Sequence, residues 1–265
     1  MPLAELGDWR VHYEEKGDGE PLLLVAGLAA DHRAWSLQVD EFARHYRTIV
    51  FDNPGIGGTS GPPGPYSAVD LADVAAALLR HLGVDRAHVV GASMGGAIAQ
   101  ELALNHPAAL RSLSLHATWP RTDNHLASIF RSWQTSARAL SFPELCRQLW
   151  LWSFTVWFYN DRADDLAELE RLVASEPDLQ TPDGFCWQAE ACIGHDALER
   201  LGAVDVPTYL TVGDRDALTP AHHTYRIKEQ IPAARLRIWQ QMAHAPHVEI
   251  PDEFNARQLE FLRSA

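Results

Sequence analysis

The feature that most constrains this chain is the glycine-rich hexapeptide Gly-Ala-Ser-Met-Gly-Gly at residues 91–96. The mostly apolar residues 87–90 predict a short buried strand before it, and residues 97–104 have apolar side chains at helical spacing. A chain that passes from strand to helix so quickly must turn sharply, and glycines on both sides of Ser93 leave room for that turn. The turn pushes the hydroxyl outward, and the following helix directs free N–H groups towards it. The hexapeptide therefore predicts a nucleophilic serine.

The G-x-S-x-G pattern is short and also occurs in ordinary turns, so its meaning depends on the rest of the chain. Strands are expected at residues 11–14, 22–26, 48–51, 87–90, 113–115, 208–212 and 234–239. Helices are expected at residues 67–82 and 97–104, after Pro220, and at 252–262. Alternation of this kind predicts an α/β fold with a mostly parallel central sheet and helices on both faces.

The alternation stops between residues 117 and 194. This stretch indicates several helices and holds six of the nine tryptophans. We therefore expect an α/β core formed by residues 1–116 and 195–265, with a helical cap, residues 117–194, inserted into it. A lid needs an apolar underside, although the same tryptophans could simply pack the cap helices together. The candidates for lining an apolar acyl pocket are Trp119, Trp152 and Trp157.

Two late loops carry the other groups that a nucleophilic serine needs. Acyl transfer requires a general base within hydrogen-bond reach and a third group that orients the base. The loop after the second-last strand contains Asp214 and Asp216, and the loop after the last strand contains His244 and His247. Both loops leave the carboxyl end of a strand, where open α/β sheets bind ligands. These residues predict a Ser-Asp-His arrangement, with two candidates for the carboxylate and two for the histidine base.

Over almost its whole length the chain resembles the α/β-hydrolase fold family. The family's G-x-x-D-x-x-x-P segment matches Gly213, Asp216 and Pro220, which implies that Asp216 is the catalytic carboxylate. The family's G-H-x-x-x-x-E-x-P-x-x-F-N segment matches the stretch that begins at Ala243-His244, with alanine in place of the first glycine. This match implies that His244 is the general base.

The resemblance also implies an oxyanion hole made of two backbone N–H groups. One belongs to Met94, directly after the serine, and the other to Leu28, which follows Gly27 on the loop after an early strand. Many members of the family have His-Gly where this chain has Ala26-Gly27. Because that histidine usually braces the loop, its replacement bears on the rigidity of the loop.

Two further histidines are candidates for the substrate pocket. His32 lies on the loop after the strand expected at residues 22–26, which faces the same edge of the sheet as the serine. His247 follows the expected base and lies at the edge of the same pocket. We expect neither a metal nor a cofactor.

The composition restricts the partners of the chain. Its 265 residues have a formal net charge of −13, whereas nucleic-acid binding needs a basic face. No run of about 18 apolar residues predicts a membrane span. The start of the chain lacks the pattern of a signal peptide, and three cysteines without metal spacing are typical of reduced thiols. We expect a cytoplasmic monomer or homodimer whose partner is a small molecule.

The segments at residues 66–82 and 90–107 are most similar to the subgroup of oxoadipate enol-lactonases and small carboxylesterases. The resemblance therefore implies a serine hydrolase that cleaves a carboxylic ester or a lactone. Two alternatives stay open: a C–C bond hydrolase that uses the same triad on a diketone, and a ligand-binding protein that keeps the fold without hydrolysis.

Overall fold

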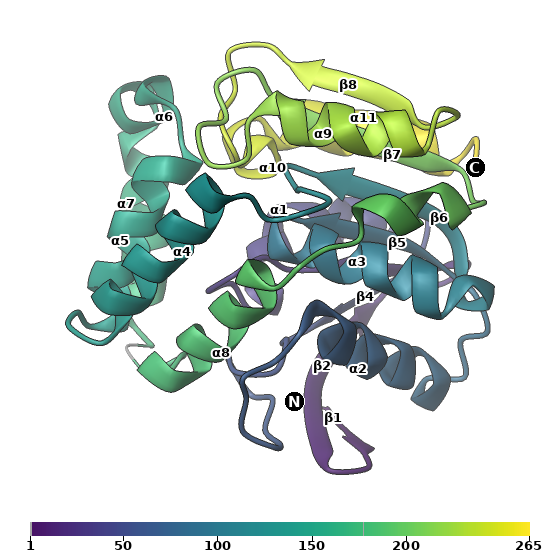
Figure 1. The fold of residues 1–265 in the computed structure, drawn as a ribbon, viewed down its shortest axis with the longest axis horizontal. Coiled ribbons are helices and arrows are strands. Elements are labelled where there is room, and N and C mark those ends of the chain that lie inside the picture. The colour runs from purple at the N-terminus through teal and green to yellow at the C-terminus, as the bar shows by residue number, and fades with distance from the viewer. Residues whose placement is uncertain (1, 177) are drawn as a thin grey trace.

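The computed structural model describes residues 2–176 and 178–265, and a sheet of eight strands runs through its centre (Figure 1). The strands are β1 (Leu3–Leu6), β2 (Trp9–Lys16), β3 (Pro21–Val25), β4 (Arg47–Phe51), β5 (Ala87–Ala92), β6 (Leu110–His116), β7 (Thr208–Gly213) and β8 (Arg235–Trp239). Their order is β1-β2-β4-β3-β5-β6-β7-β8. The neighbours from β4 to β8 pair in parallel, whereas β2 pairs antiparallel with both β1 and β4. The expected mostly parallel sheet is confirmed.

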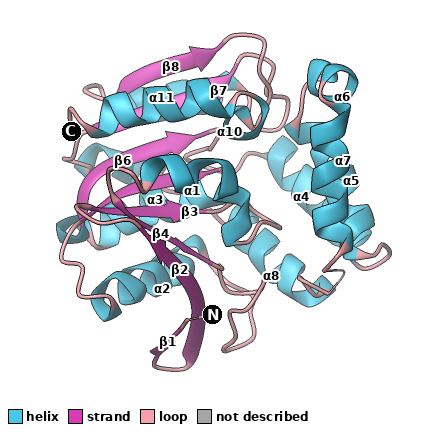
Figure 2. Cartoon of the chain, turned by 180° about the vertical axis from the view of Figure 1, so that it is seen from behind, coloured by secondary structure: helices cyan, strands magenta, loops and turns pink. Residues whose placement is uncertain are grey.

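Helices cover both faces of this sheet (Figures 1 and 2). One face carries α2 (Ala68–His81), α3 (Met94–Asn105) and α9 (Ala221–Gln230), and the other carries α1 (Ser36–Phe42) and α11 (Pro251–Leu262). The short helices are η1 (His32–Trp35), η2 (Pro107–Ala109), η3 (Leu198–Ala203) and α10 (Pro246–Glu249). Ser67 begins α2 with a capping box, in which its side chain and that of Asp70 bond each other's backbone N–H groups.

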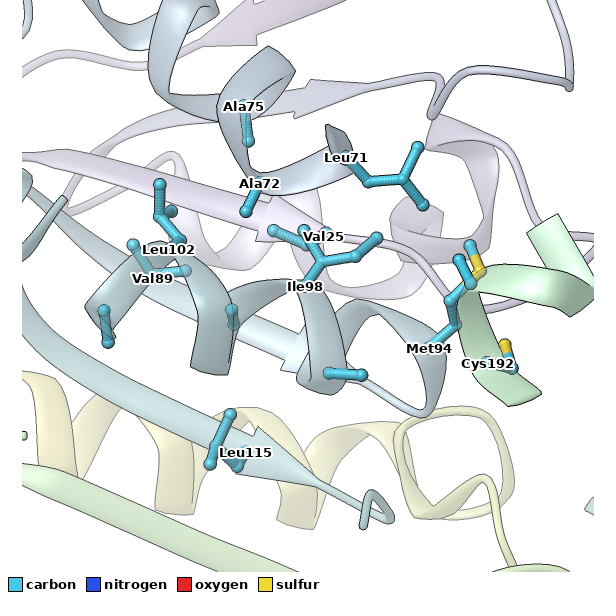
Figure 3. Packing of buried hydrophobic residues seen from close by; sticks show 14 of the residues in the cluster. Val25, Leu71, Ala72, Ala75, Val89, Met94, Ile98, Leu102, Leu115 and Cys192 are labelled. Carbon is cyan, nitrogen blue, oxygen red and sulfur yellow. The ribbon is translucent and has the colours of Figure 1, made fainter. Parts of the chain in front are cut away.

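Helix α3 lies in the middle of the main hydrophobic core. Its residues 94–103 are all buried, which explains why its sequence has no polar stripe. In Figure 3, Ile98 lies beside Val25 of β3, and Leu102 lies beside Val89 of β5. Small side chains on α3 and α2 let the two helices approach closely. This packing holds the first turn of α3, and with it the serine turn, at a fixed position against the sheet.

A group of five helices connects β6 to β7. They are α4 (Asn124–Ala137), α5 (Phe142–Ser153), α6 (Val156–Asp161), α7 (Ala163–Ala174) and α8 (Pro182–Ile193). In Figure 2 this group lies beyond the arrowheads of β6 and β8, next to the carboxyl ends of the strands. The helices occupy the segment in which a helical cap is expected. Its division from the core at residues 117 and 194 stays a prediction.

Among the strands and longer helices of the described residues, β1 and α1 were not expected from the sequence, nor were the short helices η1, η2, η3 and α10. Strand β1 has only four residues and extends the sheet by pairing with β2, and α1 follows directly on a short 3-10 helix. Both are short, and short elements give too few residues to establish a period. No helix in the described part of the chain is long and apolar enough to cross a membrane.

The three cysteines, Cys146, Cys186 and Cys192, are buried as free thiols. Burial in apolar surroundings raises the pKa of the Cys146 thiol to about 12 and also raises the pKa values of Cys186 and Cys192. All three are therefore protonated at neutral pH.

Candidate active site

Ser93 lies at the junction of β5 and α3 in a conformation that is unusual for serine. Its φ of 55° and ψ of −122° place it in a region that side chains rarely adopt. A Cβ on Gly91 would lie 2.2 Å from the Gly95 carbonyl oxygen, and a Cβ on Gly95 would lie 2.0 Å from the Val25 carbonyl oxygen. Glycine is therefore required at both positions, because the strand and the helix meet there with no space for a methyl group.

Hydrogen bonds on both sides of Ser93 hold this strained turn. The Ser93 N–H donates to the His116 carbonyl oxygen at 2.9 Å, and the Ser93 carbonyl oxygen accepts from the Thr118 hydroxyl at 2.8 Å. The Gly96 N–H also donates to that carbonyl, at 2.9 Å. These hydrogen bonds fix the backbone of Ser93 against β6 and the residues that follow it. The side chain of Ser93 takes no part in them and faces the cavity described below.

His244 and Asp216 form a buried pair on the loops after β8 and β7. The Nδ1 of His244 lies 2.8 Å from Oδ2 of Asp216. The other carboxylate oxygen accepts from the N–H groups of Leu218 at 2.9 Å and Thr219 at 2.8 Å, and the Thr219 hydroxyl donates to Oδ2 at 2.8 Å. Burial alone would raise the pKa of Asp216, but the charge and hydrogen bond of His244, with the donors from Thr219, lower it below its usual value. Asp216 is therefore a carboxylate that orients His244.

The other two candidates of the late loops have different surroundings. Asp214 is exposed, and its carboxylate accepts from the Gln241 N–H at 2.7 Å. The His247 ring lies 5.1 Å from the Trp35 ring, centre to centre. Burial and the nearby charge of His244 lower the pKa of His247 to about 3, so that this ring is neutral. The structure brings Asp216, rather than Asp214, into contact with a histidine.

Ser93 and His244 line the same cavity, which has a volume of about 620 Å³. Among the described residues no hydrogen bond joins the Ser93 hydroxyl to His244, a contact that often forms only when substrate binds. His247 and Leu28 line this cavity as well. Its apolar walls come largely from the helices between β6 and β7 and include Phe130, Trp133, Leu149, Trp150, Phe154 and Phe158.

Four of the expected pocket residues lie elsewhere. Trp119 is fully buried in the core, with its ring nitrogen donating to the Thr122 hydroxyl at 2.7 Å. Trp152 packs against the ring of Trp133, Trp157 is 37% exposed on α6, and His32 lines a different cavity. Trp152 misses the cavity because of the rotation of α5: Trp150, two residues before it on the same helix, lines the cavity instead.

The two expected oxyanion donors lie beside the serine. Met94 is the first residue of α3, and the first N–H groups of a helix have no partner within the helix. A Cβ on Gly27 would lie 3.8 Å from the Ser93 hydroxyl oxygen, so the backbone that leads to Leu28 passes directly next to the hydroxyl. The fully buried Asn53 donates to the Ala26 carbonyl oxygen at 3.0 Å. This bond braces the loop that lacks the family's histidine.

Gln188 of α8 is a structural support that the sequence did not reveal. Its side-chain oxygen accepts from the Ala29 N–H at 3.4 Å, and its amide nitrogen donates to the Pro54 carbonyl oxygen at 2.8 Å. Gln188 is fully buried. It ties the helices beside the sheet to the loop after β3, and an isolated glutamine in a helix gives no signal from which such a tie could be inferred.

Glu249 joins the histidine loop to the same group of helices. Its carboxylate accepts from the N–H and hydroxyl of Thr155, both at 2.6 Å, and from the Ala243 N–H at 3.1 Å. The N–H groups of His244 and Ala245 both donate to the Ser153 carbonyl oxygen at 3.1 Å. Glu249 belongs to the family's histidine segment, so the sequence contained its signal, although not its partner.

A serine in a strained turn after a central parallel strand, with a histidine and an aspartate on the loops after later strands, defines the class of the α/β hydrolases. The model of the alpha/beta hydrolase fold family matches residues 20–251. The chain therefore belongs to the α/β-hydrolase fold family, and it is a hydrolase.

Known relatives and structures extend this likeness over the whole chain. A protein of Azorhizobium caulinodans named "Putative carbamate hydrolase RutD" is 34% identical over an alignment of 267 positions that covers 98% of each chain. The enol-lactonase from Burkholderia xenovorans LB400 has a TM-score of 0.90 over 99% of this chain and 100% of its own, and at 24% identity it shows the fold alone. A thermophilic esterase from Thermogutta terrifontis is 26% identical, with a TM-score of 0.87 over 98% of this chain and 96% of its own.

Proposed function

We propose that this hydrolase cleaves carboxylic esters or lactones through an acyl-enzyme on Ser93. The observation that carries the proposal is that Ser93 and His244 face one cavity while His244 is hydrogen-bonded to the buried Asp216. A serine hydroxyl becomes a useful nucleophile when an oriented base can take its proton. Each of these groups comes from the carboxyl end of a different strand, where the fold gathers them at one edge.

In the proposed reaction the Ser93 oxygen attacks the carbonyl carbon while Nε2 of His244 takes the hydroxyl proton. The charge of Asp216 stabilises the imidazolium that forms, and the N–H groups of Leu28 and Met94 bind the oxyanion. His244 gives its proton to the leaving oxygen, and the ester bond breaks. His244 then takes a proton from water as the water oxygen attacks the acyl-enzyme carbonyl, and it returns that proton to the Ser93 oxygen as the bond to the acyl group breaks and the acid leaves.

The cavity favours a substrate with a neutral, apolar acyl group. A dicarboxylate would need free cations, and the two arginines at the cavity already have partners. Arg33 bonds Asp31 and Glu176, and Arg162 bonds Asp165. The aromatic and aliphatic walls can instead bury a hydrocarbon chain or ring.

A carbamate is the second candidate substrate. The observation that favours it is the name of the Azorhizobium caulinodans relative, which is 34% identical to this chain. A carbamate presents the same carbonyl to Ser93 and differs in the nitrogen attached to it. The two candidates therefore share every catalytic group and differ in the fit of the substrate to the cavity.

The direct test compares the wild type with Ser93→Ala on p-nitrophenyl esters of increasing chain length, on lactones and on an O-aryl carbamate. We expect Ser93→Ala to lower kcat at least about a thousandfold on every substrate that the wild type cleaves, because removing a nucleophile costs this much or more. Ser128→Ala is the control, since Ser128 is an exposed serine on α4.

A fluorophosphonate probe provides the second measurement, because it labels an activated serine without needing the right substrate. The wild type and Ser128→Ala should be labelled, and Ser93→Ala should not. Equal hydrolysis by Ser93→Ala and the wild type, or labelling of Ser93→Ala, would overturn the assignment of the nucleophile. Faster cleavage of the carbamate than of any ester would favour the second candidate.

A further inference from the structure

A second cavity, of about 950 Å³, is lined mainly by polar and charged residues, and neither Ser93 nor His244 is among them. His12 and Glu14 lie on β2 two residues apart, so both side chains point to the same face of the strand. His32 reaches the same cavity from η1, on the loop after β3. The proposed hydrolysis uses none of these three residues.

One buried carboxylate fixes the orientation of both imidazoles. Oδ2 of Asp52 lies 2.9 Å from Nδ1 of His12, and Oδ1 lies 2.7 Å from Nδ1 of His32. Because an ionised carboxylate only accepts hydrogen bonds, each ring carries a proton on Nδ1. When the rings are neutral, the Nε2 atom of each has a free lone pair. Asp52 is itself held by the N–H groups of His32 at 2.9 Å and Gly58 at 2.8 Å.

Within the described part of the chain, neither of these Nε2 atoms makes a hydrogen bond. His12 is only 4% exposed, and its Nε2 has no hydrogen-bond partner among the described residues. Nε2 of His32 lies 3.6 Å from Oε1 of Glu14, and the two imidazole rings are 4.6 Å apart, centre to centre. One ligand atom from each of His12, Glu14 and His32 lies within 4.8 Å of the others. A buried acceptor without a donor is costly unless something binds it.

We propose that His12, His32 and Glu14 bind a divalent transition-metal ion of the Zn²⁺ class. Two imidazole nitrogens and one carboxylate are ligands that Zn²⁺ prefers, and three protein ligands leave a position for water from the cavity. Asp52 supplies the outer shell of such a site, in which a carboxylate accepts the other N–H of each ligating histidine and fixes its orientation. Small movements of the side chains would bring the ligand atoms to about 2.0–2.2 Å from an ion.

The bound ion would join β2 to the loop after β3. This loop passes Ser93 at Gly27 and Leu28 and reaches His32 four residues after Leu28. The ion would therefore stabilise the folded chain and restrict the loop, without taking part in acyl transfer.

The test measures metal binding by the full chain, directly and by competition with a chromophoric chelator. We expect one Zn²⁺ or Co²⁺ ion per chain, with the visible bands of a low-coordinate Co²⁺ site, and a rise in Tm on adding Zn²⁺. Glu14→Gln should weaken binding at least tenfold, and His32→Ala should abolish it. Glu14 is half exposed, so Glu14→Gln should leave the fold intact even where a change at the buried His12 does not.

His222→Ala is the matched control. Among the described residues, His222, His223 and Asp123 form another group that could hold an ion, and His222 is 57% exposed. The proposal requires that His222→Ala binds the ion as the wild type does. It is overturned by a wild type that binds no ion at micromolar concentration, by equal binding in Glu14→Gln, or by loss of binding in His222→Ala. None of these results bears on Ser93, whose test is hydrolysis and labelling without added metal.

Discussion

Among the single residues of the site, the glycines next to Ser93 determine where its hydroxyl lies, because they have no side chain. Gly95 lets the first turn of α3 touch β3, because any Cβ there would meet the Val25 carbonyl oxygen at 2.0 Å. The same close approach brings the start of α3, with the N–H of Met94, and the loop that contains Leu28 next to Ser93. Two backbone donors can converge on one oxygen only where two main chains approach this closely.

The choice between the two aspartates is a prediction at this scale. Asp216→Asn should lower kcat about 10³- to 10⁴-fold, because an amide cannot hold His244 with a proton on Nδ1 or stabilise its cation. Asp214→Asn should change kcat far less, since Asp214 is exposed and its carboxylate accepts from the Gln241 N–H rather than from a histidine. Steady-state kinetics on a p-nitrophenyl ester would measure both. Equal losses, or a larger loss for Asp214→Asn, would show that the carboxylate is misassigned.

At the scale of elements, the loop that contains His244 is held from the helices between β6 and β7. The carbonyl oxygen of Ser153, at the end of α5, accepts hydrogen bonds from two N–H groups of this loop. The Glu249 carboxylate in turn bonds both Thr155 and Ala243. These helices also provide the apolar walls around Ser93. The shape of the cavity and the position of His244, the proposed general base, are therefore linked through one short junction.

Glu249→Gln tests this link. A glutamine side chain has one oxygen and one NH₂ group in place of the two oxygens, so its NH₂ group must face an N–H group of either Thr155 or Ala243. One hydrogen bond is then lost, which should lower the free energy of unfolding by about 1–3 kcal/mol. We expect kcat to fall while the KM for a short ester changes little, because His244 moves and the cavity near the acyl carbon does not. Urea unfolding and steady-state kinetics would measure the two effects. Glu253→Gln, at an exposed partner of Arg237, is the control and should change neither.

A result in which Glu249→Gln loses stability but keeps the wild-type kcat and pH profile would mean that Glu249 only supports the fold. That result would contradict the role proposed here, in which Glu249 positions the general base.

Most of the strands and the turns at Ser93 and Asp216 could be predicted from the sequence, whereas the walls of the cavity could not. Strand β3 is an uninterrupted apolar run, and the fixed spacing around Ser93 and Asp216 reflects turns that tolerate few residues, so both were predictable. The walls of the cavity were not. Whether Trp150 or Trp152 faces Ser93 depends on the rotation of α5, which is decided by packing between helices far apart in sequence. The tie made by Gln188 is hidden for the same reason.

At the scale of the whole molecule, several histidines are buried in the neutral form. Burial lowers the pKa values of His116 and His247 to about 3 and that of His195 to about 4. In the unfolded chain such groups titrate near 6.5. Below that pH the unfolded state binds more protons than the folded state does, so the free energy of unfolding falls as the pH falls. Each group contributes a loss of about 1.4 kcal/mol per pH unit until its folded pKa is reached.

We therefore expect the free energy of unfolding to decrease steeply between about pH 6 and pH 4. Urea unfolding at several pH values would measure it. His116→Gln should flatten the slope, because the imidazole that bonds Thr211 and Gln258 is gone, although the variant loses some stability at pH 7. His81→Gln, at an exposed histidine of α2, should keep the wild-type slope. A slope that is the same in His116→Gln and the wild type would contradict this account.

The burial of Cys146, Cys186 and Cys192 has a practical consequence for following motion in this molecule. Reagents such as maleimides react with thiolates, and these protonated, enclosed thiols offer almost none at neutral pH. The natural chain can therefore serve as an unreactive background for fluorescent labelling. A cysteine introduced at Leu151, which is 68% exposed on α5, would be the one position to take up a dye. A change in its signal when a substrate is added would report a movement of the helices around the cavity.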